Sequence, residues 1–117
     1  MAVRRIVANF AAPDPAAVRP FYRDLLGLRT VMDHGWIVTF AADERAAPQV
    51  SFASEGGSGT PVPDLSIEVD DVDEVYRRAI AAKVEMVYDI TDEPWGVRRF
   101  HVRDPLGRLI NILSHSA

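Results

Sequence analysis

The chain has no cysteine, no long apolar run and no excess of basic charge, and each absence excludes a class of protein. Without cysteine it cannot form disulfides, thiolate metal sites or a cysteine nucleophile. No apolar run reaches the length of about 18 residues that a membrane helix needs, and residues 1–10 lack the apolar core and cleavage site of a signal peptide. We therefore expect a cytoplasmic protein that has no membrane partner.

The charge balance argues against binding to nucleic acid. The 13 Lys and Arg residues are outnumbered by 17 Asp and Glu residues, which gives a net charge of −4. Contact with a phosphate backbone needs clustered basic residues, so we expect no nucleic-acid partner. The 117 residues, of which 48% are hydrophobic and 26% charged, suit one domain with its own core.

The first half of the chain predicts a strand, a helix and three more strands. The strand covers 3–10 and has its apolar residues on one side, namely Ile6, Ala8 and Phe10. In the helix that follows, Asp14 is the expected cap, Pro20 should cause a kink, and Gly27 can end the helix. Three short strands in a meander are predicted within 29–54.

The second half repeats this order of elements. A strand with strict alternation covers 64–69, and Asp71 is placed to cap a helix whose buried face comprises Val72, Val75, Tyr76 and Ala79. A strand at 84–90 and a hairpin follow, and the hairpin turns at the Asp-Pro-Leu-Gly sequence 104–107, which is typical of a type I turn. The small residues of 55–63 indicate a flexible linker between the halves.

The two halves align in register. The offset that places Asp14 on Asp71 also places Val18 on Val75, so an internal repeat is expected. The predicted fold is α+β, with two βαβββ modules at about 3–54 and 64–114 in a single domain, 1–117. Because each helix covers one face of its own sheet, the other faces should form a cupped, partly open mixed sheet with the helices outside. Ligands favour such concave sites.

Three motifs make this pattern similar to a known family. They are FYRDLLGL at 21–28, LSIEVDDVDEV at 65–75 and RDPLGRLINIL at 103–113. Together with the paired modules they resemble the vicinal oxygen chelate superfamily, which includes glyoxalase I, extradiol dioxygenases, and the fosfomycin and bleomycin resistance proteins. The resemblance covers about residues 4 to 114 and implies the fold, but one fold hosts many functions.

The resemblance also implies where a catalytic metal ion would bind. The ligand positions of the metal enzymes fall on Val7, approximately Ser51, Asp64 and Asn111. A catalytic divalent ion needs about three protein ligands, mostly His or carboxylate, and only Asp64 is a good ligand here. We therefore expect no metal and no other cofactor. The metal-free, bleomycin-resistance-like branch is the nearest match, and it implies a homodimer whose clefts sequester a small molecule.

The cup should present polar and aromatic side chains to that ligand. The predicted ligand-binding residues are Asn9, Trp36, Asp64, Ser66, Glu68, Trp95, Arg99, His101 and Asn111. Asn111 is expected to face the cup while its neighbours Ile110 and Ile112 face the helix. The carboxylates would favour a cation, unless Arg98 or Arg99 already neutralises them. Trp95, on a loop, could stack on a planar ligand or become buried at a subunit interface.

The sequence is compatible with three functions. The first is a metal-free protein that binds a small polar or aromatic ligand, with antibiotics among the candidates. The second is a metal-dependent lyase or dioxygenase with an atypical site built from Asp64, Glu68 and His101. The third is a metal-free enzyme in which Glu68 or His101 acts as a base.

Overall fold

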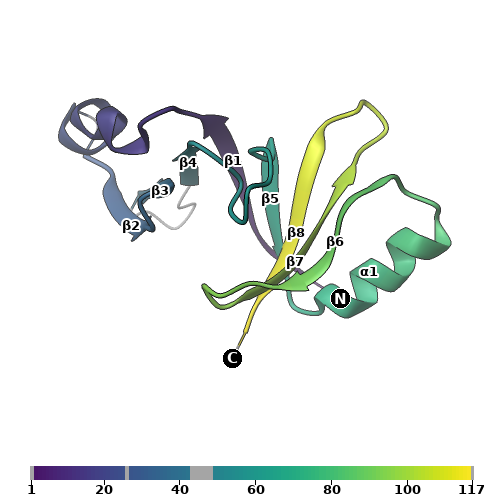
Figure 1. Cartoon of the computed structure of the whole chain (residues 1–117). Helices are drawn as coiled ribbons and strands as arrows, with labels where there is room; N and C mark the ends of the chain where they lie inside the picture. The colour runs from purple at the N-terminus through teal and green to yellow at the C-terminus, as the bar shows by residue number, and fades with distance from the viewer. Residues whose placement is uncertain (1, 26, 43–48, 117) are drawn as a thin grey trace. The chain divides into compact units, whose positions relative to one another are not determined.

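The computed structural model describes residues 2–25, 27–42 and 49–116, which form two compact units. The first unit is Val7–Val62, and the second joins Met1–Ile6 to Pro63–Ala117. Strand β1 (Val3–Ala11) contributes residues to both units (Figure 1). Within the described ranges, no helix is long and apolar enough to cross a membrane.

The first unit contains a four-stranded mixed sheet in the order β2-β3-β4-β1. Strand β1 pairs with β4 in parallel, while the other neighbours are antiparallel. Side chains of Val38, Phe40 and Phe52 form its core, and Val18 and Tyr22 from the helical segment pack against them. The three predicted strands of the meander are confirmed as β2 (Arg29–Asp33), β3 (Ile37–Ala41) and β4 (Gln49–Ala53).

The helical segment of the first unit differs from the predicted helix. It consists of a 3-10 helix, η1 (Pro15–Val18), and a π-helix, η2 (Pro20–Leu25). The predicted cap at Asp14 is wrong, because its side chain makes no capping hydrogen bond. The segment changes from a 3-10 helix to a π-helix near Pro20, where a kink is predicted because proline cannot donate a backbone hydrogen bond. Gly27 ends the segment as predicted, at a φ of +74°, and its N–H donates to the Arg23 carbonyl.

In β1 the apolar side is not the buried side. Val7 is only 4% exposed, whereas Ile6 is 56% and Phe10 is 53% exposed. Alternation in a sequence shows which residues share a face of a strand. It does not show which face the rest of the protein covers. In β1 the covered face is the one that carries Val7.

The segment 55–63 contains a turn held by hydrogen bonds. The Gly56 N–H donates to the Thr60 carbonyl at 2.7 Å, and the Gly59 N–H donates to a carboxylate oxygen of Glu55 at 2.9 Å. Gly56 is buried, and a Cβ atom added there would lie 2.2 Å from the Pro61 carbonyl oxygen. The absence of a side chain at Gly56 therefore allows the backbone of this turn to close tightly.

The second unit repeats the architecture of the first. Its strand order is β5-β8-β7-β6, with β5 parallel to β8 and the other pairs antiparallel. The predicted repeat, the α+β class and the mixed pairing are thereby confirmed. The elements are β5 (Leu65–Val69), α1 (Val72–Ala81), β6 (Met86–Asp92), β7 (Val97–Arg103) and β8 (Leu109–His115).

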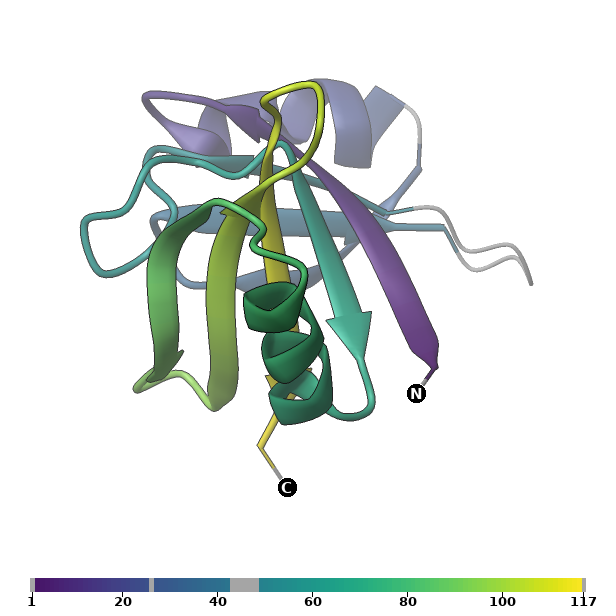
Figure 2. The same cartoon turned by 90° about the vertical axis from the view of Figure 1, so that its right-hand side faces the viewer.

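Helix α1 lies across one face of this sheet (Figures 1 and 2). Asp71 caps it as predicted, because its side chain accepts a hydrogen bond from the Glu74 N–H at 3.1 Å. The predicted helix face is confirmed as well. It packs on side chains of the sheet that include Phe100, Val102, Ile110 and Ile112.

The turn between β7 and β8 sets the register of the two strands. The Gly107 N–H donates to the Asp104 carbonyl at 2.9 Å, and the Asp104 side chain accepts from the N–H groups of Leu106 and Arg108. These bonds confirm the predicted turn. The resulting register places His101 opposite Asn111. Because their neighbours pack under α1, both side chains lie on the other face of the sheet.

Arg98 and Arg99 are adjacent on β7, so their side chains lie on opposite faces of the sheet. Arg98 pairs with Asp73 at 3.0 Å and with Asp92 at 3.1 Å, and its side chain is 34% exposed. Arg99 pairs with Glu93 at 2.8 Å, and these two side chains are only 3% and 2% exposed. The second pair is therefore buried, while the first is largely in contact with water.

Replacing Asp71 by Ala should lower the free energy of unfolding by about 1 kcal/mol, because the cap of α1 is lost. Asp14 is the matched control, since it occupies the equivalent position without a capping bond, and Asp14→Ala should change stability by less than about 0.5 kcal/mol. Urea denaturation followed by circular dichroism measures both. Equal losses in the two variants would contradict the assignment of the caps.

Replacing Glu93 by Gln should destabilise the protein by about 3–5 kcal/mol, because it leaves the charge of Arg99 buried without its counter-charge. The control is Asp73→Asn at the neighbouring exposed pair, where a loss of about 1 kcal/mol or less is expected. Chemical denaturation of both variants separates the two cases. If Glu93→Gln lowers the free energy of unfolding by no more than the control does, Arg99 is in contact with water and the pair is not buried.

Candidate functional site

A row of four side chains crosses the face of the second sheet that lies opposite α1. One residue comes from each strand, and in the strand register Ser66 pairs with Asn111, Asn111 with His101, and His101 with Tyr88. Directly opposed residues have Cβ atoms about 4.5–5.5 Å apart, so neighbours in the row can share a ligand. We call Ser66, Asn111, His101 and Tyr88 the polar row.

Tyr88 belongs to this row because β6 is irregular. Strict alternation would place it with Met86 and Ile90, which pack on the α1 side. The register of β6 against β7 instead shifts between Met86 and Tyr88 and again between Tyr88 and Thr91. Each shift adds one residue and reverses the face. The alternation of residues in β6 carries no sign of these shifts, so the sequence does not predict Tyr88 as a site residue.

Asn111 has one half of its amide engaged and the other half open. Its Nδ2 donates to the Ser66 hydroxyl at 3.1 Å. Its Oδ1 is buried and has no hydrogen-bond partner within the described part of the chain. The row thus contains a buried acceptor that can receive a donor from a bound molecule.

His101 is fully buried, with 0% exposure. Neither ring nitrogen has a hydrogen-bond partner among residues 2–25, 27–42 and 49–116, and the Tyr88 ring lies 5.1 Å away between centroids. Burial, and then the positive charge of Arg99, lowers the pKa of His101 from 6.5 to about 4. The ring is therefore neutral near pH 7 and offers one donor and one acceptor.

Glu93 organises the side chains beside the row. One carboxylate oxygen pairs with Arg99, and the other accepts a hydrogen bond from the Tyr88 hydroxyl at 3.0 Å. The Arg99 guanidinium lies 5.2 Å from the centroid of the Tyr88 ring and 5.0 Å from that of Trp95, which is within range of a cation–π contact. We call Tyr88, Glu93, Trp95 and Arg99 the aromatic clamp.

The sequence prediction found part of this arrangement. Ser66, His101 and Asn111 lie in the row as neighbours, and Trp95 and Arg99 contact each other next to it. Glu93 was missed, although it stands before the turn of the hairpin that presents Arg99. A carboxylate at the start of a hairpin turn, followed by a strand that carries an inward arginine, is the signal that could have identified it.

The two predicted carboxylates of the second unit are already engaged. A carboxylate oxygen of Asp64 accepts from the Leu109 N–H at 2.9 Å. Glu68 pairs with Arg5 at 3.1 Å and contacts the His115 ring at 2.8 Å. Because these groups are hydrogen-bonded or neutralised within the protein, they weaken the prediction of a cationic ligand.

The remaining predicted residues belong to the first unit. Asn9 lies on β1 in register with Ser51 of β4. Trp36 stacks on His34, with ring centroids 6.1 Å apart.

The four positions implied for a metal ion do not supply a suitable set of ligands. Val7 has no donor atom, and the Ser51 hydroxyl is bound to that of Thr39 at 2.7 Å. The Asp64 carboxylate already accepts a backbone hydrogen bond, and Asn111 could offer only one neutral amide oxygen. In the portion of the chain that the structure describes, no cluster of three or more His, Asp or Glu residues is placed to hold a metal. These donors do not fit a catalytic divalent ion.

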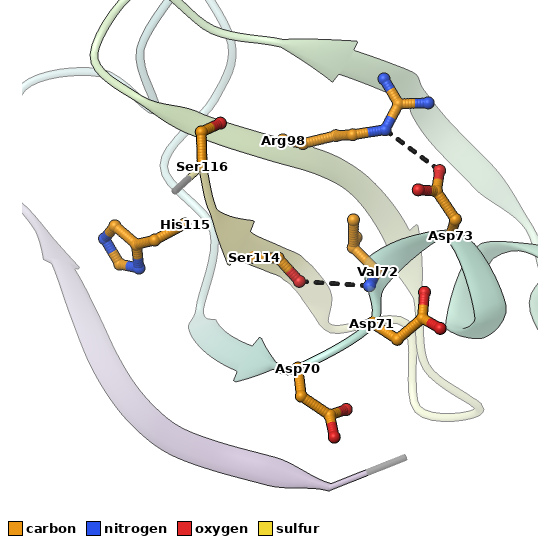
Figure 3. A pocket seen from close by; sticks show the side chains of 8 residues that line it. All are labelled: Asp70, Asp71, Val72, Asp73, Arg98, Ser114, His115 and Ser116. Carbon is orange, nitrogen blue, oxygen red and sulfur yellow. Dashed lines mark hydrogen bonds and ion pairs between the residues drawn. The ribbon is translucent and has the colours of Figure 1, made fainter.

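A separate surface pocket of about 180 Å³ lies at the start of α1 (Figure 3). Several of its polar groups have partners in the protein. The Ser114 hydroxyl accepts from the Val72 N–H and donates to the Val69 carbonyl, and Arg98 pairs with Asp73. The polar row is therefore the better candidate for a ligand site.

Solved structures share this fold at low sequence identity. NAD-dependent benzaldehyde dehydrogenase from Legionella pneumophila is 18% identical, with a TM-score of 0.75, over 96% of this chain and 100% of that one. A glyoxalase/bleomycin resistance protein/dioxygenase superfamily member from Vibrio splendidus 12B01 is 20% identical, with a TM-score of 0.66, over 97% and 99%. Methylmalonyl-CoA epimerase from Mycobacterium tuberculosis is 20% identical, with a TM-score of 0.66, over 95% and 87%. Such identities show the fold alone.

Comparison with family models gives a clearer result than these individual structures. No curated protein matches the chain. The family model for the Glyoxalase/Bleomycin resistance protein/Dioxygenase superfamily, however, matches residues 5–112. That range covers nearly all of both modules and the whole polar row, and it confirms the resemblance found in the sequence. The chain belongs to the Glyoxalase/Bleomycin resistance protein/Dioxygenase superfamily.

Proposed function

We propose that this protein binds a small molecule without a metal ion, and that the ligand docks on the polar row. The observation that carries the proposal is the pair of buried polar side chains with open hydrogen-bonding atoms, His101 and Asn111. A buried polar group without a partner costs about 1–3 kcal/mol, and proteins rarely leave one unsatisfied. A ligand that completes these bonds would remove this cost.

The chemistry of the available donors supports the metal-free part of the proposal. Asp64 is the one anion among the four implied metal positions, and its carboxylate is bound to the backbone of β8. His101 is held neutral, but it has Asn111 and Tyr88 as its register partners rather than further anionic ligands. A ligand held by hydrogen bonds and aromatic contact suits this surface better than an ion.

Sequestration of an antibiotic or related aromatic compound is one form of this proposal. The rings of Tyr88 and Trp95 in the aromatic clamp support it, because planar ligands stack on such surfaces. A homodimer also remains part of the proposal. Large apolar side chains on β1, at Val3, Ile6 and Phe10, are each more than half exposed, and a second subunit could cover them.

A thermal-shift screen of small aromatic and polar compounds, with and without EDTA, tests the proposal. A ligand present at about 100 times its Kd should add about 2.7 kcal/mol of stability, and EDTA should not remove that gain. His101→Phe should abolish the shift, whereas His115→Phe, at a half-exposed position, should keep it. Stabilisation that appears only with a divalent ion would contradict the proposal and favour a metal-dependent lyase or dioxygenase.

A further inference from the structure

We propose that the polar row recognises an uncharged group that presents a hydrogen-bond donor next to an acceptor, as a carboxamide, lactam or ureido group does. The inference rests on the proposed function and narrows it to a class of ligand. It follows from three features of the second unit: its charges, its open hydrogen-bonding atoms and the position of Tyr88.

The charges around the row are compensated within the protein. The carboxylate of Glu93 neutralises Arg99, and both side chains are almost completely buried. Glu68 is paired with Arg5, and His101 is neutral near pH 7. A charged ligand would have to leave water without gaining a counter-charge, which is unfavourable in a buried site. An uncharged ligand avoids this loss.

The open atoms define the hydrogen bonds that the ligand must supply. Asn111 already donates from Nδ2 to Ser66, so its Oδ1 requires a donor. The neutral ring of His101 can donate from one nitrogen to an acceptor. Because the two residues are directly opposed on β8 and β7, one amide group can serve both. Its N–H would bind Asn111 and its carbonyl would accept from His101.

Tyr88 is one of the side chains that cover this pair, and we infer that its ring moves when a ligand enters. His101 has no exposed surface, and the Tyr88 ring lies against it. Tyr88 belongs to β6, at the end of the strand order, and lies between two register shifts. Irregular pairing at an edge weakens the local constraint on the backbone. The bond from its hydroxyl to Glu93 holds the ring in the closed position.

Three matched probes can test the inference although the natural ligand is unidentified. Benzamide, benzoate and benzylammonium share one ring but differ in charge, and each can be titrated at pH 7 while NMR follows the His101 imidazole. Benzamide should shift the His101 signals along a saturating curve, and the two ions should not at the same concentration. Asn111→Leu should weaken benzamide binding by about two- to tenfold, the effect of one hydrogen bond. Asn111→Ser gives the same comparison if the leucine variant does not fold.

The outcomes separate this inference from the proposed function. Binding of benzoate or benzylammonium in preference to benzamide would overturn the uncharged class while leaving a small-molecule site at the row. Absence of any shift with all three probes, even in the Tyr88→Ala variant that uncovers His101, would overturn both. Benzamide binding that is unchanged in the Asn111 variants would overturn the assigned hydrogen bonds and with them the inference.

Discussion

The antiparallel pairing of β7 with β8 is the constraint on which the rest of the second unit depends. Its register sends Phe100, Val102 and Ile110 under α1 and leaves His101 and Asn111 on the opposite face. Because side chains alternate along a strand, a slip by one residue would exchange the two sets. The hydrogen bonds of the Asp104 turn fix this register, so a local sequence signal determines both the core and the site.

The same register determines which polar groups remain open on the face opposite α1. The resemblance to metal enzymes implies a metal ligand at the position of Asn111. The side chain there is an amide, and its nitrogen already donates a hydrogen bond to Ser66. The nearby charges are balanced by Glu93 and Arg99. What remains is a neutral, buried surface with open hydrogen-bonding atoms, flanked by aromatic rings. Such a surface suits recognition by hydrogen bonds rather than coordination of an ion.

Much of the fold could be predicted from the sequence, because the two halves align as a repeat and the Asp71 cap and the Asp104 turn are local signals. The helix after Asp14 was predicted less well. The sequence there contains an acceptable cap, but Pro20 interrupts the hydrogen-bond ladder and the chain forms 3-10 and π turns. Of the site, alternation identified His101 and Asn111. It could not identify Tyr88, since register shifts depend on how two strands pair and leave no periodic mark in one of them.

The most direct test of this account is an NMR titration of the His101 imidazole in the unliganded protein. A pKa near 4 is predicted, because burial and the charge of Arg99 both disfavour the protonated ring. Since the unfolded chain would protonate this histidine near pH 6.5, its contribution to stability should be present above that pH and should be lost as the pH falls towards 4. A measured pKa of 6.5 or higher would show that the ring is solvated or paired with an anion, and would contradict a buried neutral site.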